Sequence, residues 1–301
     1  MKNNSKRKLP RVAALHDLSC FGRCALTVII PALSASGIQT IPVPTALLST
    51  HTGGFTNMHF RDLDDSIGDI ARHFGELGLD FDAIYTGFLG SERQVRTVED
   101  FIDKTADENT LIFVDPVMGD DGKLYSACFP ELVAEMRRLC ARADIITPNL
   151  TEACLMTDTE YPDLSEHSEE EAEAAIGAIA EKIKTFTNAE CVITGIHFKD
   201  GVGTYCLGKM HSERARRNDY PGTGDLFASV MLAYILKSGK PLDREILQKS
   251  AEYASRFTAE VIDYSLEYGD SEPRRDGVLL EGCLGKLVAD MNMAKNSEVA
   301  H

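Results

Sequence analysis

The segment Pro221-Gly222-Thr223-Gly224-Asp225 places two glycines and a carboxyl group directly before an apolar stretch with helical spacing. A loop of this kind can turn several backbone N–H groups toward one point, and the N-terminus of the following helix adds partial positive charge there. A transferring phosphoryl group needs this environment, because its oxygens carry the charge that must be stabilised. Asp225 stands at the edge of that anion site and can accept the proton of an attacking hydroxyl. The segment also fits an ordinary helix start with Asp in the first turn, so it does not decide the chemistry alone.

Other polar side chains follow runs of residues that predict buried strands. In a parallel sheet covered by helices, ligands bind at the carboxyl ends of the strands. The repeated placement of polar residues at strand ends therefore predicts one shared site and is a stronger argument than any single motif. These residues are His16-Asp17, Thr86-Gly87, Asp115-Pro116, Thr147-Pro148-Asn149 and Thr194-Gly195.

Short β-rich runs alternate with longer stretches of helical periodicity, which predicts a mainly parallel sheet with helices on both faces. Lys199-Asp200-Gly201 is a turn signal, so the run after it is expected to pair antiparallel in a hairpin. Ser168, followed three residues later by Glu171, predicts a capping box at a helix start. The expected strands span residues 11–15, 40–43, 83–86, 111–114, 144–147, 191–194 and 202–207, and the expected helices span 23–36, 63–77, 92–105, 130–142, 169–187, 224–238 and 243–261.

Composition and charge limit the partners. The 301-residue chain has a formal net charge of −16, which argues against a surface for nucleic acid or for an anionic membrane, since both need clustered Lys and Arg. Its eight cysteines include no C-x-x-C pair, so reduced, buried thiols in a cytoplasmic protein are expected rather than disulfides or zinc. The basic segment Met1–Lys8 precedes no apolar stretch typical of a signal peptide.

The chain shows no internal repeat and no low-complexity linker, so one domain is the simpler interpretation. We expect this domain over residues 11–290, with a disordered basic arm at 1–10 before it and a loose tail at 291–301 after it. The stretch after Asp270 suggests no function.

The glycine-rich segment ending in Asp225 resembles the C-terminal signature of the ribokinase-like (PfkB-type) kinases, where the turn forms the anion hole and the Asp is the base. Three further segments resemble the pyridoxal and pyridoxamine kinases within that superfamily. They are T-G-F-L-G-S at 86–91, D-P-V-M-G-D at 115–120 and I-T-P-N-L-T-E at 146–152. Their order and spacing fit the family from about Val12 to Val261. The resemblance implies a single-domain, three-layer α/β fold, with Asp225 as base and Gly222, Thr223 and Gly224 as the anion hole.

The resemblance also implies how ATP and Mg²⁺ are held. Asp115 and Asp120 would lie near the phosphates and their metal. Asn149 and Glu152 would hold Mg²⁺ mostly through water, as suits a hard cation with oxygen ligands. The same pair fits a capping box, and the two roles are compatible. Thr194 and Thr223 resemble the hydroxyls that touch the nucleotide phosphates, and a requirement for a monovalent cation such as K⁺ is left open.

The substrate end departs from the family in one position. Aligning Phe21-Gly22 with the family's aromatic-glycine pair places Asp17 where vitamin B6 kinases have a serine, with Ser19 close enough to share its task. A carboxylate can pair with a protonated ring nitrogen or a cationic aminomethyl group. S-T-H-T-G-G-F at 49–55 resembles the family's S-N-H-T-G-Y segment, which makes His51 and Thr52 candidates for the pocket wall. Phe88 stands where the family often has Tyr and is expected to stack on the ring.

The first functional hypothesis is therefore a pyridoxine, pyridoxal and pyridoxamine kinase that uses ATP–Mg²⁺ and phosphorylates the 5′-hydroxymethyl group. The second hypothesis is a hydroxymethylpyrimidine kinase of thiamin synthesis, which the carboxylate of Asp17 keeps open. Against it, the segment S-G-I-Q-T at residues 36–40 matches only part of the A-G-I-Q-A-D segment of that branch. A sugar kinase is less favoured, because no G-G-x-x-x-N segment stands in the N-terminal half as expected. A hypothesis from a different functional class is a non-catalytic protein that binds a vitamer. Such a protein would not require a base beside an anion hole.

Two features are expected from the same reasoning. The loops at 52–56 and 120–125 contain glycines that allow movement, so they are candidates for the element that closes over the substrate. The family resemblance also suggests a homodimer.

Overall fold

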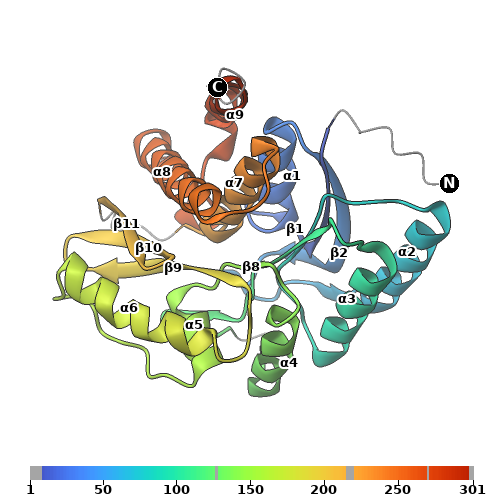
Figure 1. The fold of residues 1–301 in the computed structure, drawn as a ribbon, viewed down its shortest axis with the longest axis horizontal. Coiled ribbons are helices and arrows are strands. Elements are labelled where there is room, and N and C mark those ends of the chain that lie inside the picture. The colour runs from blue at the N-terminus through green and yellow to red at the C-terminus, as the bar shows by residue number, and fades with distance from the viewer. Residues whose placement is uncertain (1–8, 126–127, 215–219, 270, 298–301) are drawn as a thin grey trace.

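A nine-stranded sheet runs through the centre of the computed structural model, which describes residues 9–125, 128–214, 220–269 and 271–297, without the side chains of 294–297 (Figure 1). The strand order is β11-β10-β9-β8-β5-β4-β1-β2-β3. The pairs from β9 to β2 are parallel, and β3, β10 and β11 add antiparallel edges. The strands are β1 (Arg11–Phe21), β2 (Gln39–Thr50), β3 (Phe60–Asp62), β4 (Ala83–Thr86), β5 (Leu111–Val114), β8 (Ile145–Ile146), β9 (Glu190–Phe198), β10 (Gly201–Cys206) and β11 (Lys209–Arg214), and a separate hairpin joins β6 (Gly119–Asp120) to β7 (Lys123–Leu124).

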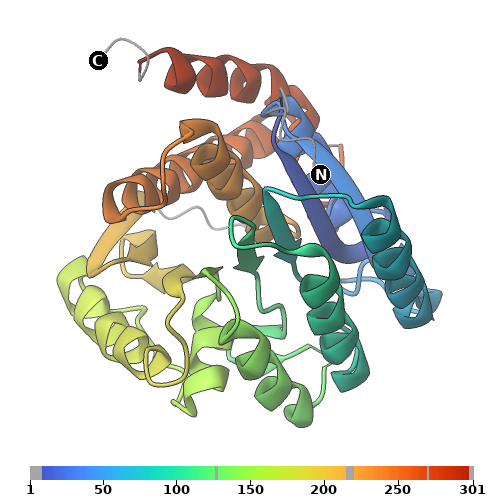
Figure 2. The ribbon, with the colours of Figure 1, turned by 45° about the vertical axis from the view of Figure 1, so that its right-hand side comes forward.

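Helices cover both faces of the sheet, as Figures 1 and 2 show. One face carries α2 (Asp64–Leu77), α3 (Glu92–Thr105), α4 (Pro130–Cys140), α5 (Leu150–Thr157) and α6 (Glu169–Ile183). The other carries α1 (Leu26–Ala35), α7 (Thr223–Ser238), α8 (Arg244–Tyr268) and α9 (Leu284–Ser297). The expected three-layer α/β arrangement is confirmed.

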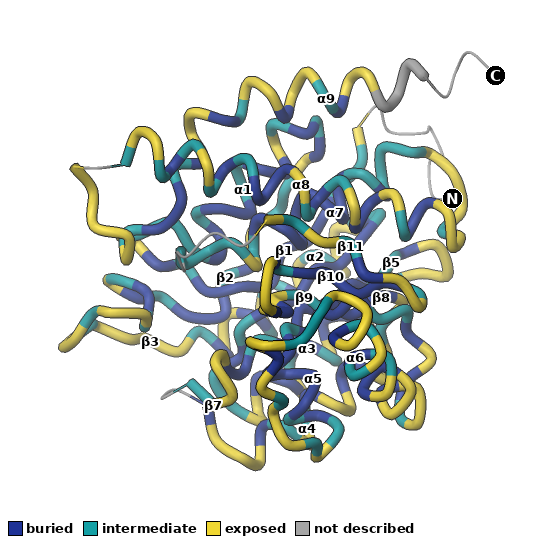
Figure 3. Tube along the Cα trace, turned by 90° about the vertical axis from the view of Figure 1, so that its left-hand side faces the viewer, coloured by how far each residue is buried: buried dark blue, intermediate teal, exposed yellow. Residues whose placement is uncertain are grey.

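The two faces are built by alternation along the strands. In β1, Ala13 and Leu15 belong to the core under α2–α6, whereas Val12 and Ala14 belong to the core under α1 and α7–α9. Successive side chains of a strand point to opposite faces, so a strand buried on both sides is apolar throughout. Figure 3 shows the result as buried strands between helices whose outer surfaces are exposed.

The predicted elements are confirmed where the sequence pattern is strong. The strands at 83–86 and 111–114 and the helix at 92–105 have the observed bounds. Strands β1 and β2 run several residues beyond their predicted ends at 15 and 43. Pro42 and Pro44 obscured β2, yet β3 pairs only with Ala46–Leu48, so the prolines lie where β2 has no outer neighbour and needs no donor there.

Several elements were not predicted, namely β3, the β6–β7 hairpin, β11 and α9, and α5 was indicated only by the capping-box pattern at its start. Residues 291–297, expected as a loose tail, form the last turns of α9, and Met291 is buried against the α1 and α7–α8 layer. Residues 1–8 of the basic arm expected at 1–10 lie outside the described residues. Within the described part of the chain, no helix has both the length and the apolar character that crossing a membrane requires.

Ser168 and Glu171 form the predicted capping box, each side chain accepting from the other residue's backbone N–H. Substituting Ser168 with Ala removes one acceptor and exposes a helix N–H without a partner. We expect Ser168→Ala to lower the free energy of unfolding by about 1 kcal/mol, measured by urea denaturation. Ser66→Ala, at an exposed position of α2, is the control and should change it by less than about 0.5 kcal/mol. Equal effects of the two variants would contradict the assignment.

Candidate active site

A cavity of about 700 Å³ opens at the carboxyl ends of the parallel strands, between the first turns of α7 and the loops after β1, β5 and β8. It brings together segments from residue 16 to residue 275. Of the site residues predicted from the sequence, all but Ser19 line it. These are Asp17, His51, Thr52, Phe88, Asp115, Asp120, Asn149, Glu152, Thr194, Gly222, Thr223, Gly224 and Asp225.

The start of α7 is built to face the cavity. Gly222 is the N-cap, with φ of 81°, and a Cβ atom there would lie 2.2 Å from the main-chain oxygen of Arg23. Only glycine fits both the conformation and the close approach. No side chain caps this end, and Thr223 Oγ1 donates to the main-chain oxygen of Tyr220 at 3.1 Å. The first-turn N–H groups therefore remain available to an anion in the cavity.

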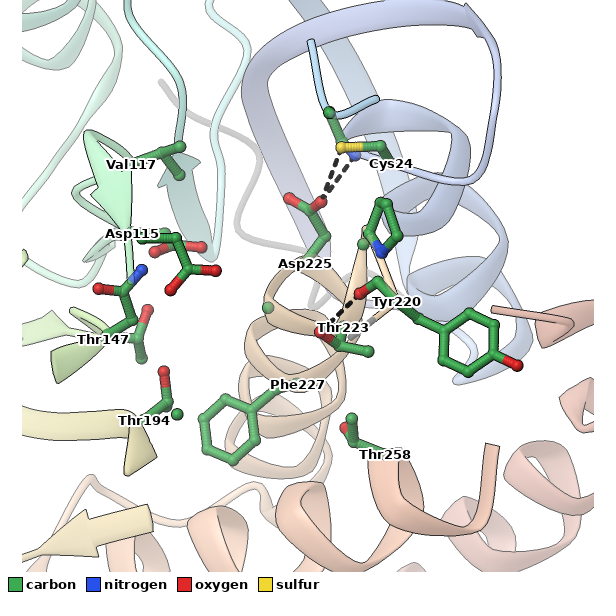
Figure 4. A pocket seen from close by; sticks show the side chains of 18 of the residues that line it. Cys24, Asp115, Val117, Thr147, Thr194, Tyr220, Thr223, Asp225, Phe227 and Thr258 are labelled. Atoms are coloured by element: carbon green, nitrogen blue, oxygen red, sulfur yellow. Dashed lines mark hydrogen bonds between the residues drawn. The ribbon is translucent and has the colours of Figure 1, made fainter. Parts of the chain in front are cut away.

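Asp225 lies between the N-termini of two helices. Its Oδ2 accepts from the backbone N–H of Ala25 at 2.7 Å and lies 3.6 Å from Cys24 Sγ, as Figure 4 shows. Burial raises the pKa of this carboxyl to about 6, the Ala25 N–H and the Cys24 thiol oppose the rise, and the nearby Asp17 charge adds to it. A carboxyl group whose pKa lies near neutrality is suited to accept a proton during catalysis.

A second acidic group lies across the cavity (Figure 4). Burial, together with the charges of Glu152 and Asp225, holds the pKa of Asp115 well above its usual range. Burial likewise raises the pKa of Glu152 to about 8, although backbone N–H groups at Asn149 and Met118 oppose the rise. Two buried carboxyl groups with raised pKa values form a site that a cation would stabilise.

The residues fit a magnesium ion held largely through water. Asn149 and Glu152 form a capping box at the start of α5. Glu152 Oε2 accepts from Asn149 N at 2.8 Å and Oε1 from Met118 N at 3.0 Å, so both of its oxygens already have donors. No three His, Cys, Asp or Glu side chains within the described ranges form a ready-made direct site. Asp115, with a carboxylate facing the cavity, is the remaining oxygen donor among the predicted ligands, and the Mg²⁺ site stays a prediction.

At the other end of the cavity, Asp17 is nearly buried and its pKa is raised by that burial, while the Ser19 hydroxyl, which donates to Asp17 Oδ2 at 2.9 Å, opposes the rise. Ser19 itself is fully buried and does not line the cavity. Ser19 therefore does not make the predicted contact with the substrate. It supports Asp17 instead, through this hydrogen bond. Phe88 is held by its main-chain oxygen, which accepts from Thr45 Oγ1 at 3.0 Å.

His51 is held on both ring nitrogens. Its Nδ1 accepts from Gly53 N at 3.1 Å, so its Nε2 carries the hydrogen and donates to the main-chain oxygen of Arg275 at 2.6 Å. These two hydrogen bonds fix the ring in the cavity wall. The loops at 52–56 and 120–125 both contribute to the cavity lining.

Other lining residues were missed by the sequence analysis as site residues. His16 is 1% exposed with an unpartnered Nε2, and burial lowers its pKa to about 3, so it is neutral. The sequence analysis placed it directly after the predicted strand at 11–15 but assigned it no role, and in the structure it lies within β1. Thr258 on α8 and Arg275 carried no signal in the sequence, because α8 reads as an ordinary amphipathic helix and residue 275 lies in the stretch after Asp270.

Residues 15–274 match the phosphomethylpyrimidine kinase family, and the chain belongs to this family. A Bacteroides thetaiotaomicron VPI-5482 protein, named as a candidate phosphomethylpyrimidine kinase, is 36% identical with a TM-score of 0.82 over 94% of this chain and 95% of its own. A second crystal form, with pyridoxal, gives 36% identity and a TM-score of 0.79 over 95% and 96%.

Pyridoxal kinases are also similar to this chain. The enzyme from Lactobacillus plantarum is 27% identical, with a TM-score of 0.81 over 95% of this chain and 99% of its own. The pyridoxal kinase of Vibrio campbellii is 28% identical over 236 residues, which are 73% of this chain and 78% of that protein. The resemblance drawn from the sequence motifs is confirmed.

The raised pKa of Asp225 has a consequence for stability. The folded state binds this proton more tightly than the unfolded chain does, because the pKa is about 6 when folded and near 3.8 otherwise. Folding therefore loses stability as the pH rises from about 4 to about 6 and does not regain it above that range. We expect Asp225→Asn to raise the free energy of unfolding at pH 8 by on the order of 1–3 kcal/mol, and by less at pH 5.

Urea denaturation at the two pH values measures this difference. Asp243→Asn is the matched control, since Asp243 is an exposed N-cap of α8 and Asn serves equally well there. A variant Asp225→Asn that is less stable than the parent at pH 8 would contradict the assignment of a burial-raised pKa.

Proposed function

We propose that this protein transfers the γ-phosphoryl group of ATP to the 5′-hydroxymethyl group of pyridoxal, pyridoxamine or pyridoxine. The observation that carries the proposal is the position of Asp225, a carboxyl group with a pKa of about 6 beside the uncapped start of α7 in a cavity of about 700 Å³. A base beside an anion site is what phosphoryl transfer to an alcohol requires. A protein that only binds a vitamer has no use for such a pair.

Asp225 is oriented for proton transfer by its neighbours. The Ala25 N–H and the Cys24 thiol both bond Oδ2, so we assign Oδ1 to the substrate hydroxyl. As the alcohol oxygen attacks the γ-phosphorus, its proton passes to this carboxylate, the bond between the γ-phosphorus and the β–γ bridging oxygen breaks, and ADP leaves. The N–H groups of the first turn of α7 then stabilise the charge on the moving phosphoryl oxygens.

The acidic group across the cavity complements this arrangement. When bound, Mg²⁺ would neutralise charge on the phosphates, held by Asp115 and, through water, by Asn149 and Glu152. Thr194 in β9 pairs with Asn149 in an isolated parallel bridge and lines the cavity, which suits contact with the nucleotide phosphates. Asp120, exposed on the β6–β7 hairpin, lies at the rim of the same region.

We propose a substrate with a pyridine ring rather than a pyrimidine ring for two reasons. The 36% identical Bacteroides protein was crystallised with pyridoxal, and several relatives are named as kinases of pyridoxal, one of them also of pyridoxine and pyridoxamine. Asp17 lines the substrate end and can pair with a protonated pyridine nitrogen. The family is nevertheless named for phosphomethylpyrimidine, which makes hydroxymethylpyrimidine kinase the second candidate.

The proposed function also concerns the cellular compartment and the oligomeric state of the protein. All eight cysteines are free, which suits a reducing compartment such as the cytoplasm. The homodimer expected from the resemblance stays a prediction, and sedimentation of the purified protein measures it directly.

The substrate assignment predicts the order of specificity constants. With ATP–Mg²⁺, we expect kcat/KM for at least one of pyridoxal, pyridoxamine and pyridoxine to exceed that for hydroxymethylpyrimidine by roughly tenfold or more, about 1.4 kcal/mol of transition-state preference. A coupled ADP-release assay measures all four. If the pyrimidine leads, the second candidate replaces the first, and turnover of none of the four would favour a binding protein.

The mechanism predicts that Asp225→Asn lowers kcat by about 10²–10⁴-fold, because the alcohol loses its base, while the dissociation constant for the substrate changes little. Steady-state kinetics and isothermal titration calorimetry separate the two effects. Asp243→Asn, at a residue that does not line the cavity, should keep full activity. Unchanged turnover in Asp225→Asn would remove the proposed role of this residue.

A further inference from the structure

Arg275 brings a positive charge into a cavity that is otherwise acidic. Among the described residues that line the cavity, it is the only Arg or Lys, whereas seven Asp or Glu side chains line the same space. It lies at the substrate end, because its contacts are with His51, Gly54 and Phe55. A single cation at the end of the cavity where the ring is expected indicates recognition of a negatively charged part of the substrate.

The guanidinium group is positioned but not neutralised. Its carbon Cζ lies 4.8 Å from the centre of the Phe55 ring, and Nη1 lies 3.5 Å from the main-chain oxygen of Gly54. Among the described residues, the one carboxylate within 4 Å is that of Asp276, at 3.9 Å from Nε. Because the side chain is 55% exposed and has only these weak contacts, its N–H groups can bond a ligand.

The backbone around Arg275 is held in place by four contacts. Its own oxygen accepts from His51 Nε2, and the neighbouring Asp276 oxygen accepts from Arg23 N at 2.9 Å. The Arg23 side chain in turn pairs with Glu272 and Glu281, on either side of the segment. A charged group on a backbone anchored in this way loses little freedom when it binds a ligand.

We propose that Arg275 binds the ionised ring hydroxyl of a 3-hydroxypyridine substrate and thereby selects pyridines over pyrimidines. This inference rests on the proposed function. A 3-hydroxypyridine at neutral pH carries a protonated ring nitrogen and an ionised hydroxyl, and Asp17 and Arg275 offer the two complementary charges at one end of the cavity. Hydroxymethylpyrimidine has no ring hydroxyl, so it gains nothing from Arg275.

The test compares pyridoxine with 3-deoxypyridoxine, which lacks only the ring hydroxyl. We expect Arg275→Gln to lower kcat/KM for pyridoxine about tenfold, mostly through KM, because a charge-assisted bond at a half-exposed position is lost equally in ground and transition states. The value for 3-deoxypyridoxine should change less than about twofold. Arg275→Lys should restore part of the loss, since it keeps the charge without the planar fork.

Arg274→Gln is the matched control, because it removes the same charge from an exposed neighbour that does not line the cavity. Equal losses for both substrates in Arg275→Gln would assign the residue to support of the His51–Phe55 wall and overturn the proposal, and so would no loss for either. Calorimetric binding of the two ligands to the parent and to Arg275→Gln gives the same comparison without turnover. A parent that turns over no vitamer defeats the proposed function, whereas the binding comparison still decides the role of Arg275.

Discussion

The hydrogen bond from the Ala25 N–H to Asp225 connects the two helix N-termini on which the site depends. It holds the carboxylate in the first turn of α7 and links α7 to the loop before α1. The close approach of Gly222 to the Arg23 oxygen fixes the same two segments from the other side. Arg23 also binds the segment that carries Arg275. The proposed base, the anion site and the cation at the substrate end therefore all rest on residues 22–25.

The cavity explains how a chain with a net charge of −16 could bind the anionic nucleotide that we propose as its substrate. Its described lining has seven carboxyl groups and one Arg, so among these described residues Lys and Arg side chains are not the main source of positive potential. The N–H groups of the α7 start supply part of it. A cation bound at the buried carboxyl groups would supply the rest, which makes the acidity of the site a complement to a metal ion rather than an obstacle to phosphate.

Three carboxyl groups in the cavity are less stable in their charged form there than they would be in water. Burial raises the pKa of Asp225, Asp115 and Glu152, which means that the folded protein disfavours their charged forms. Structures that hold charged groups in this way usually do so because the site needs them during reaction or binding. The burial of these carboxyl groups lowers the stability of the fold. The apolar cores on both faces of the sheet offset that loss.

The sequence by itself determined the features that depend on local geometry. Capping boxes at Ser168 and Asn149 and the glycine-rich start of α7 involve residues a few positions apart, so their chemistry can be recognised along the chain. Only the tertiary structure decided that Ser19 supports Asp17 from behind the cavity wall, and that Arg275 joins His51 across more than two hundred residues. Such contacts follow from strand order and helix packing, and no short-range periodicity encodes them.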